Sequence, residues 1–164
     1  MSNQKLLNES VCVIRDEKAY NTVAGSITQN SYATRTLNTL LGDSYFVSLS
    51  SNQFTLQPGR YKIDIVVPSH GVDYSQAILW STTNSAIFQD ASGLVINGLT
   101  NISILSIINV PTFTLASAHT FEVKQICSGS GASETHAGGD PVSWAAGGSS
   151  VKSIYTSVTV RKLR

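Results

Sequence analysis

The sequence predicts an all-β protein, an antiparallel jelly-roll sandwich that forms one domain. Apolar and polar residues alternate with a period of two in several stretches, and no stretch sustains the period of an α-helix. Gly, Pro and Asn residues that favour turns separate these stretches. Only 13% of the 164 residues are charged, about half the usual share, so Ser, Thr and Asn must supply much of the polar surface. Several short strands with turn signals between them are typical of a sandwich or jelly roll.

The first strand is expected at residues 11–15, after a polar N-terminal arm at residues 1–10. The single β domain then covers residues 11–164. Residues 33–43 are compatible with a turn or two of helix before Gly42, but their threonines are equally typical of an irregular strand. The alternation predicts no helix of ordinary length anywhere in the chain.

The clearest strand signal lies in residues 54–68, which predict a β-hairpin with one face in water. Pro58 and Gly59 supply a tight turn between the two strands. Lys62 and Asp64 point to solvent, and four residues point inward. The inward residues are Tyr61, Ile63, Ile65 and Val67. Pro68 lacks a backbone N–H and is expected to end the strand, with a loop at residues 68–75.

Further strands follow with turn signals between them. Residues 76–81 predict a short strand, and Asn97-Gly98 predicts a second hairpin within residues 94–105. Pro111 predicts either a strand break or a sheet edge.

The last two strands are expected on either side of a long loop. Residues 120–126 alternate, with Phe121 and Val123 inward and Glu122 and Lys124 outward. Residues 153–163 are rich in β-branched side chains, which predicts a strand in the centre of a sheet.

Between these strands, residues 128–150 predict a long Gly/Ser-rich loop. Structureless loops of this length inside a compact domain are usually functional or disordered. His136, Asp140 and Trp144 lie in this loop among small residues, so they are the candidate contacts for a partner or receptor.

The order of these segments resembles the C1q/TNF-like jelly-roll domains of bacteriophage virion proteins. The resemblance covers about residues 35–163, and its core is Phe54-x-Leu56, the Pro58-Gly59 turn and a strand that begins Gly-x-Tyr-x-Ile. Residues 155–163 are similar to the last core strand of that family. The resemblance implies a homotrimer whose protomers pack side by side around a threefold axis, with loops clustered at the two ends.

The charge balance excludes two common classes of partner. The chain has 11 Lys and Arg against 10 Asp and Glu, a net charge of +1, so neither nucleic acid nor an anionic membrane is predicted as a partner. The first ten residues lack the apolar core of a signal peptide, and no apolar run is long enough to span a membrane. We therefore expect synthesis in the host cytoplasm without membrane insertion, and a final place in a virion.

No catalytic, metal or cofactor site is predicted. No pair of carboxylates stands out for glycoside hydrolysis, and Asp16 and Glu17 are expected in a turn. His70 with Asp73, and His136 with Asp140, have spacings that loops could bring together, but loop side chains of these types usually hydrogen-bond to turns.

Two cysteines, Cys12 and Cys127, lie far apart in the sequence. They are interpreted either as buried thiols or as a disulfide that forms after release.

The function predicted from these features is a non-enzymatic, trimeric capsid decoration or cement protein on the outside of a phage particle. Its partners would be its own copies and the major capsid protein or other virion proteins. The candidate docking residues are Gln4, Lys5, Leu6 and Leu7 of the arm, which could order only on docking. The alternative is a tail-fibre or tail-tip protein for host adhesion, whose long loop would contact a cell-surface glycan or protein.

Overall fold

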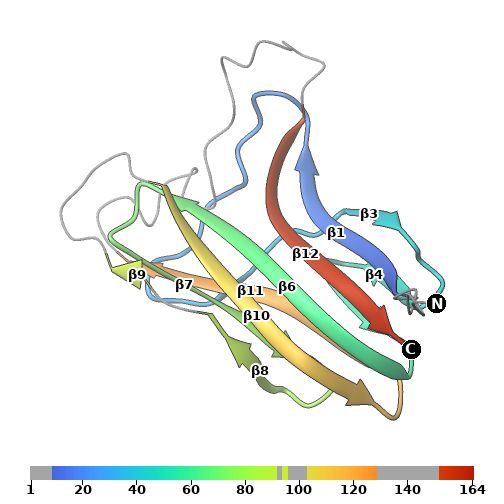
Figure 1. Cartoon of the computed structure of the whole chain (residues 1–164). Helices are drawn as coiled ribbons and strands as arrows, with labels where there is room; N and C mark the ends of the chain where they lie inside the picture. The colour runs from blue at the N-terminus through green and yellow to red at the C-terminus, as the bar shows by residue number, and fades with distance from the viewer. Residues whose placement is uncertain (1–8, 92–93, 96–102, 129–151) are drawn as a thin grey trace, which may run out of the picture.

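The computed structural model describes residues 9–91, 94–95, 103–128 and 152–164, and these residues form β-strands (Figure 1). The strands are β1 (Ser10–Lys18), β2 (Ala33–Thr34), β3 (Thr39–Gly42), β4 (Val47–Ser50), β5 (Gln53–Leu56), β6 (Gly59–His70), β7 (Tyr74–Ser81), β8 (Ala86–Asp90), β9 (Leu94–Val95), β10 (Ser103–Leu115), β11 (His119–Ser128) and β12 (Ser153–Leu163). Nothing in the described part of the chain is a helix that could cross a bilayer.

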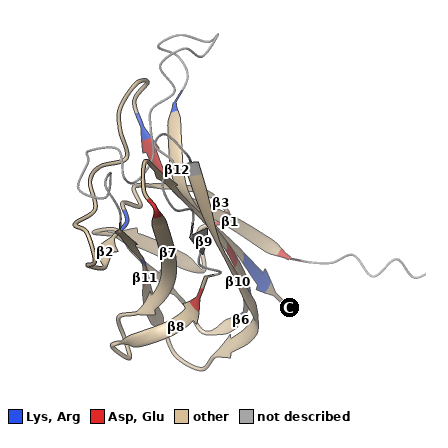
Figure 2. Ribbon diagram, turned by 90° about the vertical axis from the view of Figure 1, so that its left-hand side faces the viewer, with Lys and Arg blue, Asp and Glu red and all other residues tan. Residues whose placement is uncertain are grey.

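The strands form two antiparallel sheets that pack face to face. Sheet A has the order β10-β6-β12-β1-β3, and sheet B has the order β4-β5-β11-β7-β8, with β2 beside β11 and β9 beside β7. The all-β jelly roll predicted from the sequence is confirmed. The C-terminal strand β12 lies between β6 and β1, as its β-branched composition predicted (Figure 1). Most of the ribbon in Figure 2 belongs to uncharged residues, in line with the composition.

The alternating side chains of β6 build the centre of the apolar core. All four predicted inward residues are fully buried, while Lys62 between them is exposed. Across sheet A, Ile65 pairs with Val158 on one side and Ile108 on the other. Each such side chain contributes roughly 1.5–3 kcal/mol of hydrophobic stabilisation when buried.

One end of the interior is aromatic. Phe121 of β11 stacks on Phe54 at a centroid distance of 5.6 Å and meets the edge of Phe88 at 5.0 Å. His119 lies against Phe121 at 4.6 Å. These rings therefore pack together at one end of the interior.

The hairpin predicted at Pro58-Gly59 is wrong. β5 pairs with β4 and β11 in sheet B, whereas β6 pairs with β10 and β12 in sheet A. The turn therefore carries the chain from one sheet to the other. The hydroxyl of Tyr61 donates to the carbonyl of Gln57 at 2.7 Å and holds this crossover in place.

The strand end predicted at Pro68 is also wrong, and so is most of the loop predicted after it. β6 continues through Pro68 to His70, and β7 begins at Tyr74. The ladder between β6 and β12 ends at Val66, so Pro68 pairs on one side only, with Leu105 of β10. A missing N–H is tolerated where a strand has a single neighbour.

The second hairpin, predicted at Asn97-Gly98, is also wrong, although these two residues lie outside the described part of the chain. β9, before them, pairs with β7 in sheet B, and β10, after them, pairs with β6 in sheet A. Of the two alternatives for Pro111, the sheet edge is confirmed. β10 is the outer strand of sheet A and continues past Pro111 with a register shift between Val110 and Phe113.

Residues 33–43 form strands rather than helix. β2 pairs with β11, and β3 pairs with β1. Of the long loop predicted at residues 128–150, Ser128 is the last residue of β11, and residues 129–150 lie outside the described part of the chain.

Candidate interaction surface and buried polar cluster

Four apolar side chains share the outer face of sheet A at its β10 side. Leu105 and Ile107 of β10 are 55% and 44% exposed, and Val66 of β6 is 38% exposed. Ile107 pairs with Val66, and Leu105 pairs with Pro68, so the four side chains form a block two strands wide. We call these four residues the apolar block. Isolated exposed apolar residues are ordinary, but contiguous ones mark contact surfaces.

The apolar block lies beside a sheet edge that no other described strand of sheet A pairs with. β10 is thirteen residues long, and within the described part of the chain its partner in sheet A is β6. Long exposed edges with apolar side chains are sites of association unless something covers them. The irregularity at Val110–Phe113 blunts the edge at one end, which leaves the half that carries Leu105 and Ile107 open.

The opposite end of the same face is charged. Lys62 of β6 pairs directly with Arg161 of β12, and Arg60 is exposed nearby. Arg161 forms an ion pair with Asp64. Like charges directly opposite each other on two strands are unfavourable. We therefore expect the charged end of the face to remain in contact with water, and a protein contact to be centred on the apolar block.

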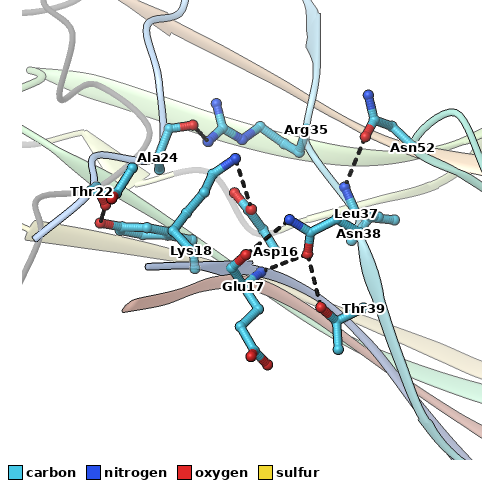
Figure 3. A network of polar contacts seen from close by, with 11 residues as sticks. Asp16, Glu17, Lys18, Thr22, Ala24, Arg35, Leu37, Asn38, Thr39 and Asn52 are labelled. Atoms are coloured by element: carbon cyan, nitrogen blue, oxygen red, sulfur yellow. Dashed lines mark hydrogen bonds and ion pairs between the residues drawn. The ribbon is translucent and has the colours of Figure 1, made fainter. Parts of the chain in front are cut away.

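A second unusual feature is a cluster of charged side chains inside the sandwich (Figure 3). Asp16 of β1 is 0% exposed and Arg35, which follows β2, is 3% exposed. Lys18 Nζ lies 3.2 Å from Asp16 Oδ1, and Figure 3 shows the guanidinium of Arg35 directed toward the carbonyl of Ala24. Buried charges are rare because they lose hydration, and they persist only when other groups compensate them.

The local backbone explains why Asp16 points inward. The β1–β12 ladder shifts register between Arg15 and Glu17, so Asp16 occupies a β-bulge rather than the predicted turn. Asn38 completes the backbone pairing at this bulge. Its side chain accepts from Glu17 N and donates to Glu17 O, each at 2.9 Å. These contacts fix the strand so that Cys12, Ile14 and Asp16 all face the interior.

The pKa values of the two buried groups follow from their surroundings. Burial raises the pKa of the Asp16 carboxyl, and the positive charges of Lys18 and Arg35 oppose this effect. Burial also lowers the pKa of the Arg35 guanidinium, which the charge of Asp16 opposes. Both effects express the cost of placing charges out of contact with water.

Neutral polar side chains continue the cluster between the sheets. Gln125 Nε2 of β11 donates to Ser69 Oγ at 2.6 Å and to Ser75 Oγ at 2.9 Å, which links sheet B to β6 of sheet A. Several buried polar atoms in this half of the interior have no hydrogen-bond partner. They are Asp16 Oδ2, Arg35 Nε, Ser106 Oγ, Gln125 Oε1, Ser153 Oγ and Thr156 Oγ1, whereas Asp16 Oδ1 has its ion pair with Lys18.

The structure also contains a serine–histidine contact that the sequence did not indicate. Ser81 Oγ and His119 Nε2 are 2.6 Å apart, and Asn84 N donates to the same hydroxyl at 3.0 Å. Both side chains are buried at the aromatic end. Among the residues that the structure describes, no carboxylate is hydrogen-bonded to this imidazole.

Acid should destabilise the protein through His119. Burial lowers the pKa of its imidazole, so the unfolded state takes up a proton at a higher pH than the folded state does. Stability is thus fully present above the unfolded pKa and falls as the pH drops below it, by at most about 1.4 kcal/mol per pH unit for one proton. Urea titrations between neutral and mildly acidic pH should show this slope for the wild type and a shallower slope for His119→Gln. Equal slopes would assign the acid sensitivity to other groups.

The candidate site residues from the sequence cannot be compared with this geometry. His136, Asp140 and Trp144, and Gln4, Lys5, Leu6 and Leu7 of the arm, all lie outside the described residues. Their roles remain predictions.

The two cysteines, Trp80, His70 and Asp73 lie within the described part of the chain. Cys12 and Cys127 are both buried thiols rather than a disulfide. Burial, followed by the charge of Asp43, raises the pKa of the Cys12 thiol to about 11. Such a thiol is unreactive at neutral pH. Trp80 of β7 lies under Lys124 Nζ, which is 4.1 Å from its ring centroid. Within the described ranges, no three metal-ligating side chains come together, at His70 and Asp73 or elsewhere.

Comparison with known proteins supports the fold alone. No protein-family model matches the sequence, and no curated protein matches it. Solved structures of murine APRIL match the chain at low identity. The pH 8.0 crystal structure has a TM-score of 0.56 at 12% identity and covers 95% of this chain and 100% of that chain. The pH 5.0 structure gives 0.56 at 13% identity with the same coverage. This chain therefore has a TNF-like jelly-roll fold.

Proposed function

We propose that this protein is a non-enzymatic, trimeric structural protein of a bacteriophage particle, and that it decorates the outside of the capsid. The observation that carries the proposal is the exposed apolar block beside the open edge of β10. Burying it against a second copy removes apolar surface from water on both partners.

The fold favours a threefold arrangement of these contacts. TNF-like jelly rolls pack side by side as homotrimers, which is what the resemblance to phage domains implies for this chain. In a closed trimer each apolar block would contact a neighbouring subunit, so no apolar block would remain exposed to water. The interface would bury roughly 1,200–2,000 Å² per pair, the usual size for a stable complex.

The capsid role is supported by features that a binding protein needs and an enzyme does not. The described residues offer a rigid sandwich with few charges, and its serine–histidine pair is buried. The proposed contact with the coat is the N-terminal arm, which leads into β1 at Ser10. Subunit contacts and particle contacts would then use different parts of the chain.

Removing the arm separates these two contacts. A chain that begins at Glu9 keeps β1 intact, so we expect it to form the same trimer and to lose attachment to particles that lack the native protein. The matched control is a full-length chain with Asn3→Ser and Asn8→Ser, which keeps the arm and all four candidate docking residues. The measurement is co-sedimentation with particles, together with the solution mass from light scattering.

Two results would contradict the proposal at different points. A wild-type mass of one protomer would refute the trimer. A truncated trimer that still sediments with particles would remove the arm from the attachment mechanism.

A further inference from the structure

Tyr45 is the most exposed large apolar side chain in the described part of the chain, at 70%. It lies in the short loop between β3 and β4, next to Phe46, which is fully buried. The carbonyl of Phe46 accepts from Gln57 N at 2.9 Å, so the loop is fixed to the crossover between β5 and β6. The loop therefore holds an aromatic ring in water from a fixed backbone position.

Three contacts hold the side chain of Tyr45 in place without covering it. Its hydroxyl donates to Ser10 Oγ at 3.1 Å, and its ring meets Phe46 edge-on at a centroid distance of 5.2 Å. Lys162 Nζ lies 5.2 Å from the centroid of the same ring. A side chain that is already ordered loses little conformational entropy when a partner covers it. Aromatic side chains of this kind are typical of the residues that carry most of the energy of a protein interface.

Lys162 has no carboxylate partner among the described residues. Its ammonium lies 5.7 Å from the ring centroid of Phe46 and 5.9 Å from that of Tyr61, and none of the ion pairs in the described part of the chain includes it. Side chains alternate along β12, so Lys162 lies on the opposite face of the strand from Arg161 and the charged end of sheet A. A carboxylate supplied by a partner would form a charge-assisted hydrogen bond with this ammonium.

These side chains lie where the N-terminal arm joins the domain. Ser10 is the first residue of β1 and pairs with Lys162 near the end of β12, and Figure 1 shows these two strand ends side by side. Leu7, a predicted docking residue, is three residues before Ser10, so the covalent chain keeps the two within about 11 Å of each other. A coat protein that bound Leu7 would therefore come close to Tyr45, whose hydroxyl contacts Ser10.

We propose that Tyr45 and Lys162 together bind the major capsid protein next to the arm. The capsid protein would supply an apolar recess for the ring of Tyr45 and a carboxylate for the ammonium of Lys162. This inference rests on the proposed capsid role, and it adds a contact on the folded domain to the contact made by the arm. A second copy of this chain is not favoured as the occupant, because the proposed subunit contact lies elsewhere. The β6–β12 ladder pairs Lys162 with Tyr61 near one end, and Ser157 with Val66 of the apolar block at the other.

The test measures binding of the purified protein to particles that lack the native protein, by co-sedimentation over a range of protein concentrations. Tyr45→Ala should raise the dissociation constant about 30-fold, the size expected for an aromatic side chain at the centre of a contact. Tyr45→Phe keeps the ring and should bind nearly as well as the wild type. Lys162→Gln should weaken binding and make it less sensitive to salt, because the partner carboxylate no longer has an ammonium to pair with.

Ile154→Ala is the matched control. Ile154 is an apolar side chain of β12 that is 48% exposed, and it pairs with Glu17 near the far end of the β1–β12 ladder from Ser10. This variant also removes an exposed apolar side chain, so it should bind particles as the wild type does. Light scattering should give the wild-type mass for every variant, because none of the substituted side chains belongs to the apolar block.

A Tyr45→Ala protein that binds particles as tightly as the wild type would overturn this inference and leave the capsid role intact. Equal weakening by Ile154→Ala would also overturn it. A reduced mass for Tyr45→Ala would do the same, because the side chain would then belong to the subunit contact. Unchanged affinity and salt dependence for Lys162→Gln would refute the partner carboxylate. Wild-type protein that fails to bind particles would refute the capsid role itself, and this inference with it.

Discussion

Replacing Leu105 and Ile107 together by arginine is expected to turn the proposed trimer into monomers. Both side chains point outward from β10 and are largely exposed in the single chain, so the change should leave the fold of the protomer intact. In the proposed trimer the same positions would be buried, and two unpaired guanidinium groups per interface would have to lose their hydration. We expect the dissociation constant to rise by at least about 10³-fold, equivalent to about 4 kcal/mol. Light scattering after size exclusion measures the mass directly.

The matched control is Leu41→Arg, which places a new charge at an exposed apolar residue of β3. β3 is the strand at the opposite edge of sheet A from β10, so Leu41 lies away from the apolar block. This variant should remain trimeric. A double β10 variant that keeps the trimer mass would show that another surface holds the subunits together.

The second large effect is expected for Gly42→Ala at the end of β3. Gly42 has a φ of +87°, and a Cβ at this position would lie 2.5 Å from the carbonyl oxygen of Val11. That oxygen accepts from Asp43 N at 2.9 Å, and Gly42 itself pairs with Cys12. The substitution combines an unfavourable backbone conformation with a backbone clash. We expect it to lower the free energy of unfolding by about 3 kcal/mol or more.

Gly71→Ala is the matched control for this effect. Gly71 also has a left-handed φ, +65°, but nothing lies within 4 Å of the added Cβ. Its cost should be limited to backbone strain, about 1–2 kcal/mol. Urea unfolding of both variants at one protomer concentration gives the comparison. Equal losses would mean that the clash with Val11 is relieved by a shift of β3.

The inward residues of β6 show what periodicity can predict. A strand with apolar residues at every second position buries the face that carries them. Its apolar residues therefore identified the core directly, and they are Tyr61, Ile63, Ile65 and Val67. The same reasoning found β12, whose β-branched residues suit a strand with neighbours on both sides. These predictions depend on local side-chain chemistry, which the sequence contains.

Local sequence signals do not determine which strands pair. Pro58-Gly59 correctly indicated a turn, but a turn does not specify whether the next strand returns beside the first or crosses to the other sheet. In a jelly roll it often crosses, and β5 and β6 do so. The strand end predicted at Pro68 was wrong for a related reason. A missing N–H interrupts a strand only where a neighbouring strand would accept a hydrogen bond from it.

The buried cluster was partly visible in the sequence. Cys12, Ile14 and Asp16 continue one alternation, so an inward Asp16 could have been inferred by extending the strand past Arg15. The adjacent charges at positions 16–18 suggested a turn instead. No local signal marks Arg35 as buried, because its position depends on the pairing of β2 with β11. The apolar block likewise emerges only when β10 and β6 are placed side by side.

The number of copies of this chain per purified particle tests the central proposal most directly. Quantitative mass spectrometry against the coat protein measures it, and geometry relates copy number to location. A decoration trimer should be present in hundreds of copies, comparable with the coat protein. A handful of copies, in multiples of three, would contradict capsid decoration and indicate the tail-tip adhesion alternative.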